Sequence, residues 1–370
     1  MVRYVPFTEP LPSCKPPKRP PLTVEEQEKY DKLLERMKSI KELPISSDPN
    51  EKTKRPLSDE EQAWVTKECM LRYLRATKWK LADAQKRVEG SLIWRREYGV
   101  GELSPDYISP EPMLTRPQNE TGKQVILGYD FASRPCLYLF PSRQNTDKSN
   151  RQIQHLVFSL ERVIDFMPSG QENLALLIDF KSSTSSTNPS VSQGRQVLHI
   201  LQTHYPERLG KALVINIPWF VWTFLKIIYP FIDPLTREKL VFSEPIDKYV
   251  PAEHLDSIFG GKSEFEYHHD KYWSAMCEIA DEKRKRYMER WHKLGGGVGL
   301  SEAALRAETE EEMQAELART ETLEKEAEAA NTKTAEEAAA DIDAAELVEK
   351  TTAVTVEEQL SEVSLQDKSS

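Results

Sequence analysis

The chain has 370 residues, a length that allows one large domain or two smaller ones. Its formal net charge of −10 is unevenly distributed, because residues 301–370 hold 20 acidic and 6 basic residues while the first 300 hold 40 acidic and 44 basic. A mildly basic body with an acidic tail suits contact with anionic surfaces, and the lack of a Lys/Arg stripe interleaved with aromatic residues argues against nucleic-acid binding.

Residues 1–22 are rich in proline and are predicted to form an extended N-terminal arm. The stretch has no apolar segment like that of a secretory signal, so we expect a cytoplasmic protein. The four cysteines match no zinc or redox spacing and are expected to be free thiols; they are Cys14, Cys69, Cys136 and Cys277.

A helical N-terminal lobe is predicted over residues 23–99. Its three expected helices cover residues 24–40, 58–76 and 81–98, with a linker at 43–57. Thr23 and Ser58 can cap the first two helices, and Glu61 is placed for a capping box with Ser58. The third helix is expected to stop at Gly99.

Strands and helices alternate after residue 120, and residues 100–294 are predicted to form a second lobe. The expected strands are 123–129, 135–140, 174–178 and 211–217, and the expected helices are 151–167, 189–204, 252–259 and 267–293. The first two strands resemble a hairpin, whereas helices separate the later ones. Such spacing favours right-handed crossovers and therefore an α/β fold whose sheet is mostly parallel with mixed edges.

Three glycines, Gly295 to Gly297, are expected to end the folded body. The remaining tail, residues 295–370, is rich in Ala and Glu and has few large apolar residues. Such a composition cannot bury a core, so this acidic low-complexity tail is predicted to be disordered or partly helical.

Residues 212–232 are the most apolar part of the chain and carry a single charge, Lys226. Pro218 interrupts the run, so residues 219–229 form at most a helix about 16 Å long, too short to span a bilayer. Only Thr223 and Lys226 are polar in that helix. A helix so apolar is usually buried in a core, and the alternative is a helix with one side in lipid.

No catalytic motif is present in the sequence. It contains no Gly-x-Ser-x-Gly, no Gly-x-Gly-x-x-Gly and no Walker Gly-Lys. The adjacent His268 and His269 would point about 100° apart on a helix and cannot share a metal as an i,i+4 pair can. We therefore expect neither an enzyme nor a bound metal or cofactor.

An ordered series of motifs identifies a family resemblance. The segments are Leu71-Arg72-Tyr73-Leu74-Arg75-Ala76-Thr77-Lys78-Trp79, Trp94-Arg95-Arg96-Glu97-Tyr98-Gly99, Tyr205-Pro206-Glu207-Arg208-Leu209-Gly210-Lys211, Asn216-Ile217-Pro218, the run 230–239 and Phe259-Gly260-Gly261-Lys262-Ser263-Glu264. Together they resemble the CRAL-TRIO lipid-binding domain of yeast-type phosphatidylinositol transfer proteins over about residues 58–266. The stretch 205–242 is most similar to the fungal branch linked to pleiotropic drug resistance.

The resemblance implies a helical lobe and an α/β lobe that enclose an apolar pocket, closed by a gate helix at about 219–230. The implied gate and membrane-contact residues are Trp219, Phe220, Trp222, Phe224 and Ile228, and the implied hinge residues are Gly210, Gly260 and Gly261. It favours a lipid-facing helix over a core helix.

The resemblance also implies a lipid headgroup site made of Glu207, Lys239 and Lys78. From the residues alone, a structural ion pair of Glu207 with Arg208 is favoured over a headgroup role. The chain departs from the family pattern at Thr77, where the family has Arg, and at Leu174 to Leu176, where it has hydroxyl residues. The second departure puts phosphatidylcholine binding in doubt.

The implied function is binding of phosphatidylinositol and its exchange between membranes, which would regulate lipid metabolism. Membrane contact is expected to be transient, at the endoplasmic reticulum, lipid droplets or the cell periphery. Two alternatives stay open: a carrier of a sterol or another neutral apolar ligand, and a lipid-sensing scaffold. A homodimer is a further expectation from the resemblance.

Overall fold

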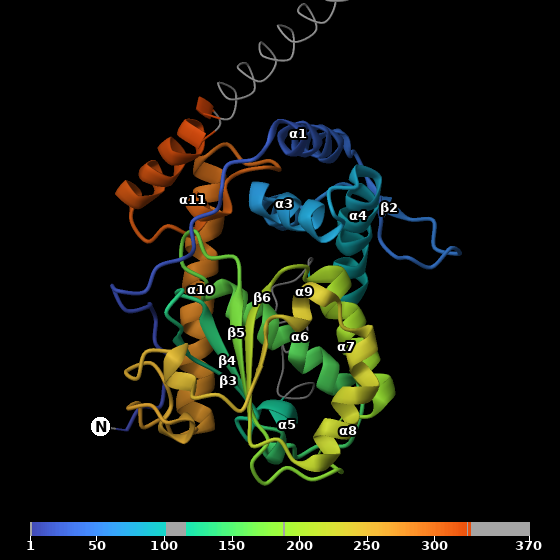
Figure 1. The fold of residues 1–370 in the computed structure, drawn as a ribbon. Coiled ribbons are helices and arrows are strands. Elements are labelled where there is room, and N and C mark those ends of the chain that lie inside the picture. The colour runs from blue at the N-terminus through green and yellow to red at the C-terminus, as the bar shows by residue number, and fades with distance from the viewer. Residues whose placement is uncertain (1, 101–115, 188, 324, 327–370) are drawn as a thin grey trace, which may run out of the picture. The chain divides into compact units, whose positions relative to one another are not determined.

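The computed structural model describes residues 2–100, 116–187, 189–323 and 325–326 (Figure 1). Two compact units are distinguished. Met1–Arg19 and Lys29–Leu317 make up the folded body, and Pro20–Glu28 with Ala318–Ser370 make up the second unit. The predicted tail beyond residue 326 lies outside the described residues.

The helical lobe contains the expected helices, with one difference. They are α1 (Val24–Ser39), α2 (Asp59–Trp64), α3 (Lys67–Ala76) and α4 (Leu81–Tyr98), and two short strands, β1 (Leu43–Pro44) and β2 (Lys54–Arg55), pair in the linker. The predicted caps at Thr23 and Ser58, the capping box of Ser58 with Glu61 and the end of the third helix at Gly99 are present, and Gly99 is left-handed. The predicted second helix is two helices, because Val65 ends α2 and the Thr66 hydroxyl caps α3 by accepting from the amide of Cys69 at 3.0 Å.

The second lobe is built on a five-stranded sheet in the order β3-β4-β5-β6-β7. The strands are β3 (Gln124–Tyr129), β4 (Pro135–Leu139), β5 (Leu174–Asp179), β6 (Leu209–Ile215) and β7 (Leu240–Phe242). β3 pairs antiparallel with β4, and the other neighbours pair in parallel. The prediction of a mostly parallel sheet with a mixed edge is therefore confirmed.

Helices α6 to α8 lie beside this sheet, as Figure 1 shows. Helix α10 packs against α6, where the rings of Trp273 and Phe158 stack 5.2 Å apart, and it reaches the edge strand β3 through the Tyr272 hydroxyl, which donates to the carbonyl of Ile126 at 3.0 Å. The helices of this lobe are α5 (Arg116–Asn119), α6 (Asn150–Asp165), α7 (Val191–His204), α8 (Trp219–Ile228), α9 (Pro234–Arg237) and α10 (His269–Lys293). The helix predicted at 252–259 is wrong: this stretch contains turns and one 3₁₀ turn, Ser257–Phe259. There the carboxylate of Asp256 accepts from the amide of Ile258 at 3.0 Å, which favours a turn over continued helix.

The two faces of the sheet are buried to different degrees. Leu139, Ile178, Val214 and Phe242 lie in register across four strands, so their side chains share one face. Three of these four side chains are only half-buried. The opposite face is filled by fully buried side chains, among them Cys136, Tyr138, Ala175, Leu177 and Leu213. We call the first face the half-buried sheet face.

The predicted end of the folded body at residue 295 differs from the structure. A short helix, α11 (Glu302–Arg306), packs on the body, and Ala304, Leu305 and Met313 are completely buried. The backbone amide of Lys67 also donates to the carbonyl of Leu300 at 3.0 Å. The body therefore continues well past the three glycines. Buried apolar side chains and ion pairs, such as that of Glu302 with Arg72 at 2.8 Å, dock a segment whose composition alone predicts a tail.

The N-terminal arm is extended, as predicted, and it is fixed to the body. The amide of Arg3 donates to the carbonyl of Glu264 at 2.7 Å, and that of Phe7 donates to the carbonyl of Leu127 at the same distance. The Phe7 ring also stacks on His254, with centroids 4.1 Å apart. These contacts place residues 2–19 along the edge of the second lobe.

Candidate functional site

Helix α8 presents aromatic side chains to solvent. Trp219 is 79% exposed and Trp222 is 40% exposed, and large apolar side chains continue along the chain at Tyr229, Phe231 and Leu235. This exposure excludes a plain core helix. Among the described residues, no helix combines the length and the apolar character that crossing a bilayer requires.

The other side of α8 packs against the body. The Trp222 ring lies 5.2 Å from that of Phe242, which places α8 over the half-buried sheet face. A Cβ added at Gly194 of α7 would lie 2.8 Å from Cζ of Phe224, so the two helices approach closely and require a glycine there. Ile228 is buried and Phe220 meets Trp219 edge to face. Among the predicted gate residues, Trp219 therefore faces solvent, Trp222 is partly exposed and also touches the sheet face, and Phe220, Phe224 and Ile228 are turned toward the body.

Cationic side chains border this exposed apolar surface. The guanidinium of Arg195 lies 4.3 Å from the centroid of the Phe231 ring, and that of Arg237 lies 4.5 Å from the Tyr229 ring. Lys226 is exposed on α8 itself. An apolar surface with a cationic rim has the character of a surface that lies on an anionic membrane.

Two of the three predicted headgroup residues lie near each other. Glu207, just before β6, has a left-handed backbone with φ 57°. The side-chain amide of Asn173 donates to the backbone carbonyl of Glu207 at 2.5 Å. Lys239 directly precedes β7 and is half-buried. Burial lowers the pKa of Lys239, and the negative charges of Glu207 and Asp233 oppose that shift. The backbone amide of Ala212 in β6 donates to the carbonyl of Lys239 at 2.9 Å, which places Lys239 beside the strand that Glu207 precedes.

Lys78, the third predicted residue, is exposed in the turn that follows α3 and has φ 53°. Arg75, one turn earlier, contacts Glu207, with 2.5 Å between Nε and Oε2. Sequence reasoning missed Arg75 as a site residue, although it lies in the same motif as Lys78. The ion pair expected for Glu207 is therefore real, but its partner is Arg75 and not the adjacent Arg208.

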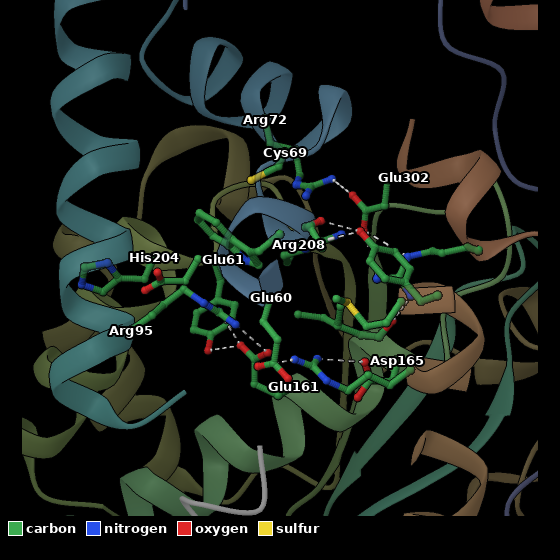
Figure 2. Close-up of a pocket in the computed structure, with 18 of the residues that line it drawn as sticks. Glu60, Glu61, Cys69, Arg72, Arg95, Glu161, Asp165, His204, Arg208 and Glu302 are labelled. Carbon is green, nitrogen blue, oxygen red and sulfur yellow. Dashed lines mark hydrogen bonds and ion pairs between the residues drawn. The ribbon is translucent and has the colours of Figure 1, made fainter. Parts of the chain in front are cut away.

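A cavity of about 70 Å³ lies between α2, α3, α6, α10 and α11 (Figure 2). Charged side chains line it, including Arg72, Arg208 and Glu302. Arg95 and Glu161 form a double ion pair across it at 2.8 and 3.2 Å. A polar space of this size has room for a few water molecules and not for acyl chains. It is therefore not the apolar pocket that the sequence implied.

The predicted hinge glycines each have a local reason to lack a side chain. Gly210 lies at a register shift between β5 and β6, and a Cβ there would clash with Arg134. Gly260 has φ 90°, and a Cβ at Gly261 would meet the carbonyl of Leu255. These contacts and backbone angles explain the glycines without any motion, and the hinge role of the glycines remains a prediction.

Comparison with known proteins gives consistent matches. The sequence profile of the CRAL/TRIO domain matches residues 119–261, and that of the CRAL/TRIO N-terminal domain matches residues 29–90. A CRAL-TRIO domain-containing protein of Schizosaccharomyces pombe is 56% identical over 281 residues, which cover 76% of this chain and 27% of that protein. Its full length is therefore much greater than the aligned part.

Two relatives have names that state an activity or a location. The phosphatidylinositol transfer protein PDR17 of Saccharomyces cerevisiae is 41% identical over 297 residues, covering 76% of this chain and 83% of the yeast protein. The SEC14 cytosolic factor of Candida glabrata is 32% identical over 214 residues, covering 53% of this chain and 70% of that protein.

Proposed function

The chain belongs to the CRAL-TRIO family, and we propose that it binds phosphatidylinositol and transfers it between membranes. The observation that carries the proposal is the position of α8. Its aromatic side chains face solvent on one side and cover the half-buried sheet face on the other. The relatedness to PDR17, which is named for this activity, supports the choice of lipid.

Free diffusion of such a lipid through water has a prohibitive cost. A diacyl lipid has on the order of 30 methylenes, and exposing each costs about 0.8 kcal/mol, so the total is tens of kcal/mol. A carrier lowers this cost by enclosing the acyl chains in an apolar space, so that exchange with a bilayer is nearly balanced. We place this space between α8 and the half-buried sheet face, where large apolar side chains are incompletely covered.

Opening that space is favourable only at a membrane. In water, moving α8 away from the sheet would expose a large apolar area. At a bilayer, Trp219 and Trp222 exchange contact with water for contact with lipid, while the cationic rim of Arg195, Lys226 and Arg237 faces the phosphates. We therefore propose α8 as the gate helix and these side chains as its membrane contact.

The headgroup would be held at Glu207 and Lys239. Lys239 can pair with the lipid phosphate as a point charge, and a half-buried ammonium gains more from such a partner than an exposed one. Arg75 binds Oε2 of Glu207, which leaves Oε1 to accept from an inositol hydroxyl. Lys78 lies in the neighbouring turn and is proposed as a further cationic contact.

A transfer assay tests the proposal directly. Purified protein is mixed with donor liposomes that contain labelled phosphatidylinositol and with unlabelled acceptor liposomes. We expect protein-dependent movement of the label, and mass spectrometry of the purified protein should show phosphatidylinositol bound to it. Absence of both would contradict the proposed function.

The double variant Trp219→Ala with Trp222→Ala should weaken membrane binding. Burying a large apolar side chain contributes about 1.5–3 kcal/mol, so losing two should lower vesicle binding at least roughly tenfold. The unfolding free energy should fall by no more than about 1–2 kcal/mol, because Trp219 is largely exposed and Trp222 loses only its contact with Phe242. Vesicle co-sedimentation and urea denaturation measure the two effects.

A matched control removes two exposed apolar side chains elsewhere. Phe131→Ala with Ile258→Ala changes residues that are 51% and 47% exposed and lie outside α8. This control should bind vesicles like the unchanged protein. Equal binding by the tryptophan variant would rule out α8 as the membrane contact.

We further propose that the protein works in the cytoplasm without catalysing a reaction and contacts membranes transiently. The name of the Candida glabrata relative, a cytosolic factor, agrees with this location. The membranes visited, with the endoplasmic reticulum, lipid droplets and cell periphery as candidates, belong to the same proposal. The three relatives' names give no support to a sterol cargo or a homodimer, so neither is part of it.

A further inference from the structure

A carboxylate from the docked C-terminal segment lies inside a cluster of arginines. Glu302 begins α11 and lies outside both regions that match the CRAL/TRIO profiles. It contacts Arg72 at 2.8 Å, Arg208 at 3.1 Å and Arg306 at 3.1 Å. Figure 2 shows Glu302 facing Arg72 and Arg208, which come from opposite lobes.

This carboxylate is buried and ionised. Burial alone would raise the pKa of Glu302, but Arg208, Arg72 and Arg306 outweigh it and hold the pKa well below its usual range. Arg72 and Arg208 are also buried. Each therefore depends on neighbouring carboxylates, because a buried guanidinium without a counterion is strongly unfavourable.

A chain of ion pairs leads from Glu302 to Glu207. Arg72 also binds Glu172 at 3.0 Å, Glu172 binds Arg75 at 3.1 Å, and Arg75 binds Glu207 at 2.5 Å. Glu302 and Glu172 both bind Arg72, and Glu172 and Glu207 both bind Arg75, so neighbouring carboxylates in the chain share an arginine. These contacts form a continuous path of ion pairs between Glu302 and Glu207.

A second route runs through the backbone. Arg208 directly follows Glu207, and its guanidinium is held by Glu302 and by the carbonyl of Glu172 at 3.0 Å. The strained left-handed backbone of Glu207 is thus fixed on one side by Asn173 and on the other by the anchored Arg208. Positions of this kind persist when the surrounding structure holds them.

We propose that Glu302 is a positioning residue for the headgroup site. It neutralises Arg72 and Arg208, so that Glu172 remains shared with Arg75, and Arg75 holds the Glu207 carboxylate in place. Without the Glu302 charge, Arg72 would draw Glu172 away from Arg75 and the Glu207 side chain would lose its fixed orientation. This inference rests on the proposed function, since it concerns the same headgroup site.

The test uses full-length Glu302→Gln, which keeps the shape of the side chain and removes its charge. Transfer of phosphatidylinositol is compared with transfer of phosphatidylglycerol that has the same acyl chains and charge but no inositol ring. We expect the ratio of the two rates to fall roughly tenfold, within the coupling that members of one charge network show. A purely structural role would lower both rates together and leave the ratio unchanged.

The matched control is Glu308→Gln in the same docked segment. The Glu308 carboxylate binds Lys283 at 2.7 Å and Arg286 at 2.6 Å, both on α10. This control should leave the ratio within roughly twofold of the unchanged protein, since its ion pairs do not lead toward Glu207. If Glu302→Gln fails to fold, Glu302→Asp replaces it, because the shorter side chain cannot reach both Arg72 and Arg208 and leaves one of them without this partner; the ratio should again fall.

A double variant tests whether the effect of Glu302 passes through Glu207. In a Glu207→Gln background, adding Glu302→Gln should not lower the ratio further, because its effect passes through Glu207. An unchanged ratio in Glu302→Gln, or a further fall in the double variant, overturns the inference. Failure of the unchanged protein to transfer phosphatidylinositol would instead contradict the proposed function.

Discussion

Replacing both Glu207 and Lys239 with alanine should abolish phosphatidylinositol transfer. Hydrogen bonds to charged groups contribute about 1.5–3 kcal/mol each, so removing one to the phosphate and one to an inositol hydroxyl should weaken binding roughly 100-fold or more. The fold should remain intact, because Lys239 is half-buried and Arg75 keeps Glu172 as a partner at 3.1 Å. Liposome transfer and thermal unfolding measure the two effects.

The chain offers a control with the same change in charge. Glu244 and Lys248 form an exposed ion pair at 3.8 Å, so replacing both with alanine also removes one acid and one base. Exposed pairs contribute little to stability, and this variant should transfer lipid normally. Undiminished transfer by the Glu207 and Lys239 variant would remove both residues from the site.

Elements with local signals were predicted well. The capping box of Ser58 and Glu61, the left-handed Gly99 and the hairpin around Asp130 each depend on residues within a few positions of one another. The alternation of apolar strands and helices is also a local pattern, and it predicted a mostly parallel sheet, although β7 was not among the expected strands. Such features can be read from the sequence because the interactions that cause them span one turn or one hairpin.

Features that depend on distant partners were missed. Glu302 meets Arg72 across 230 positions and Arg208 across 94, so the composition of its segment predicts a tail while its contacts dock it. Arg75 meets Glu207 across 132 positions, and its motif gave no sign that its side chain would be the partner. The break at Val65 and Thr66 was missed for a local reason, since Thr66 fits a helix interior as well as a cap.

The sequence left open whether α8 is buried in the core or exposed on one side, and the structure decides between the two. Its composition fits both a core helix and a helix with one side in lipid. Burial separates the two, because Trp219 faces solvent while Ile228, on the same helix, is buried. Exposed tryptophans above a half-buried apolar sheet face are unfavourable in a protein that stays in water, and they become favourable at a bilayer.

The largest effect on stability is expected from Glu61→Ala. The Glu61 carboxylate forms a double ion pair with Arg96 at 2.6 and 2.9 Å. It also accepts hydrogen bonds from the guanidinium of Arg55 and from the backbone amide of Ser58. The side chains of Glu61 and Arg96 are almost completely buried. Removing one partner of a buried pair leaves the other charge uncompensated, so the unfolding free energy should fall by about 3–5 kcal/mol, as measured by urea denaturation.

Glu60, the residue before Glu61, is the control that separates the effect of burial from the effect of charge. The carboxylate of Glu60 forms an ion pair with Arg284 at 3.3 Å, and both of these side chains are partly exposed. Glu60→Ala should therefore cost less than about 1 kcal/mol, because solvent screens the pair. Equal losses in the two variants would mean that α2 depends on its overall charge and not on the buried pair. The difference between them should instead follow from Arg96, which anchors α4 to the carbonyls of Leu43 and Pro44 only while Glu61 neutralises it.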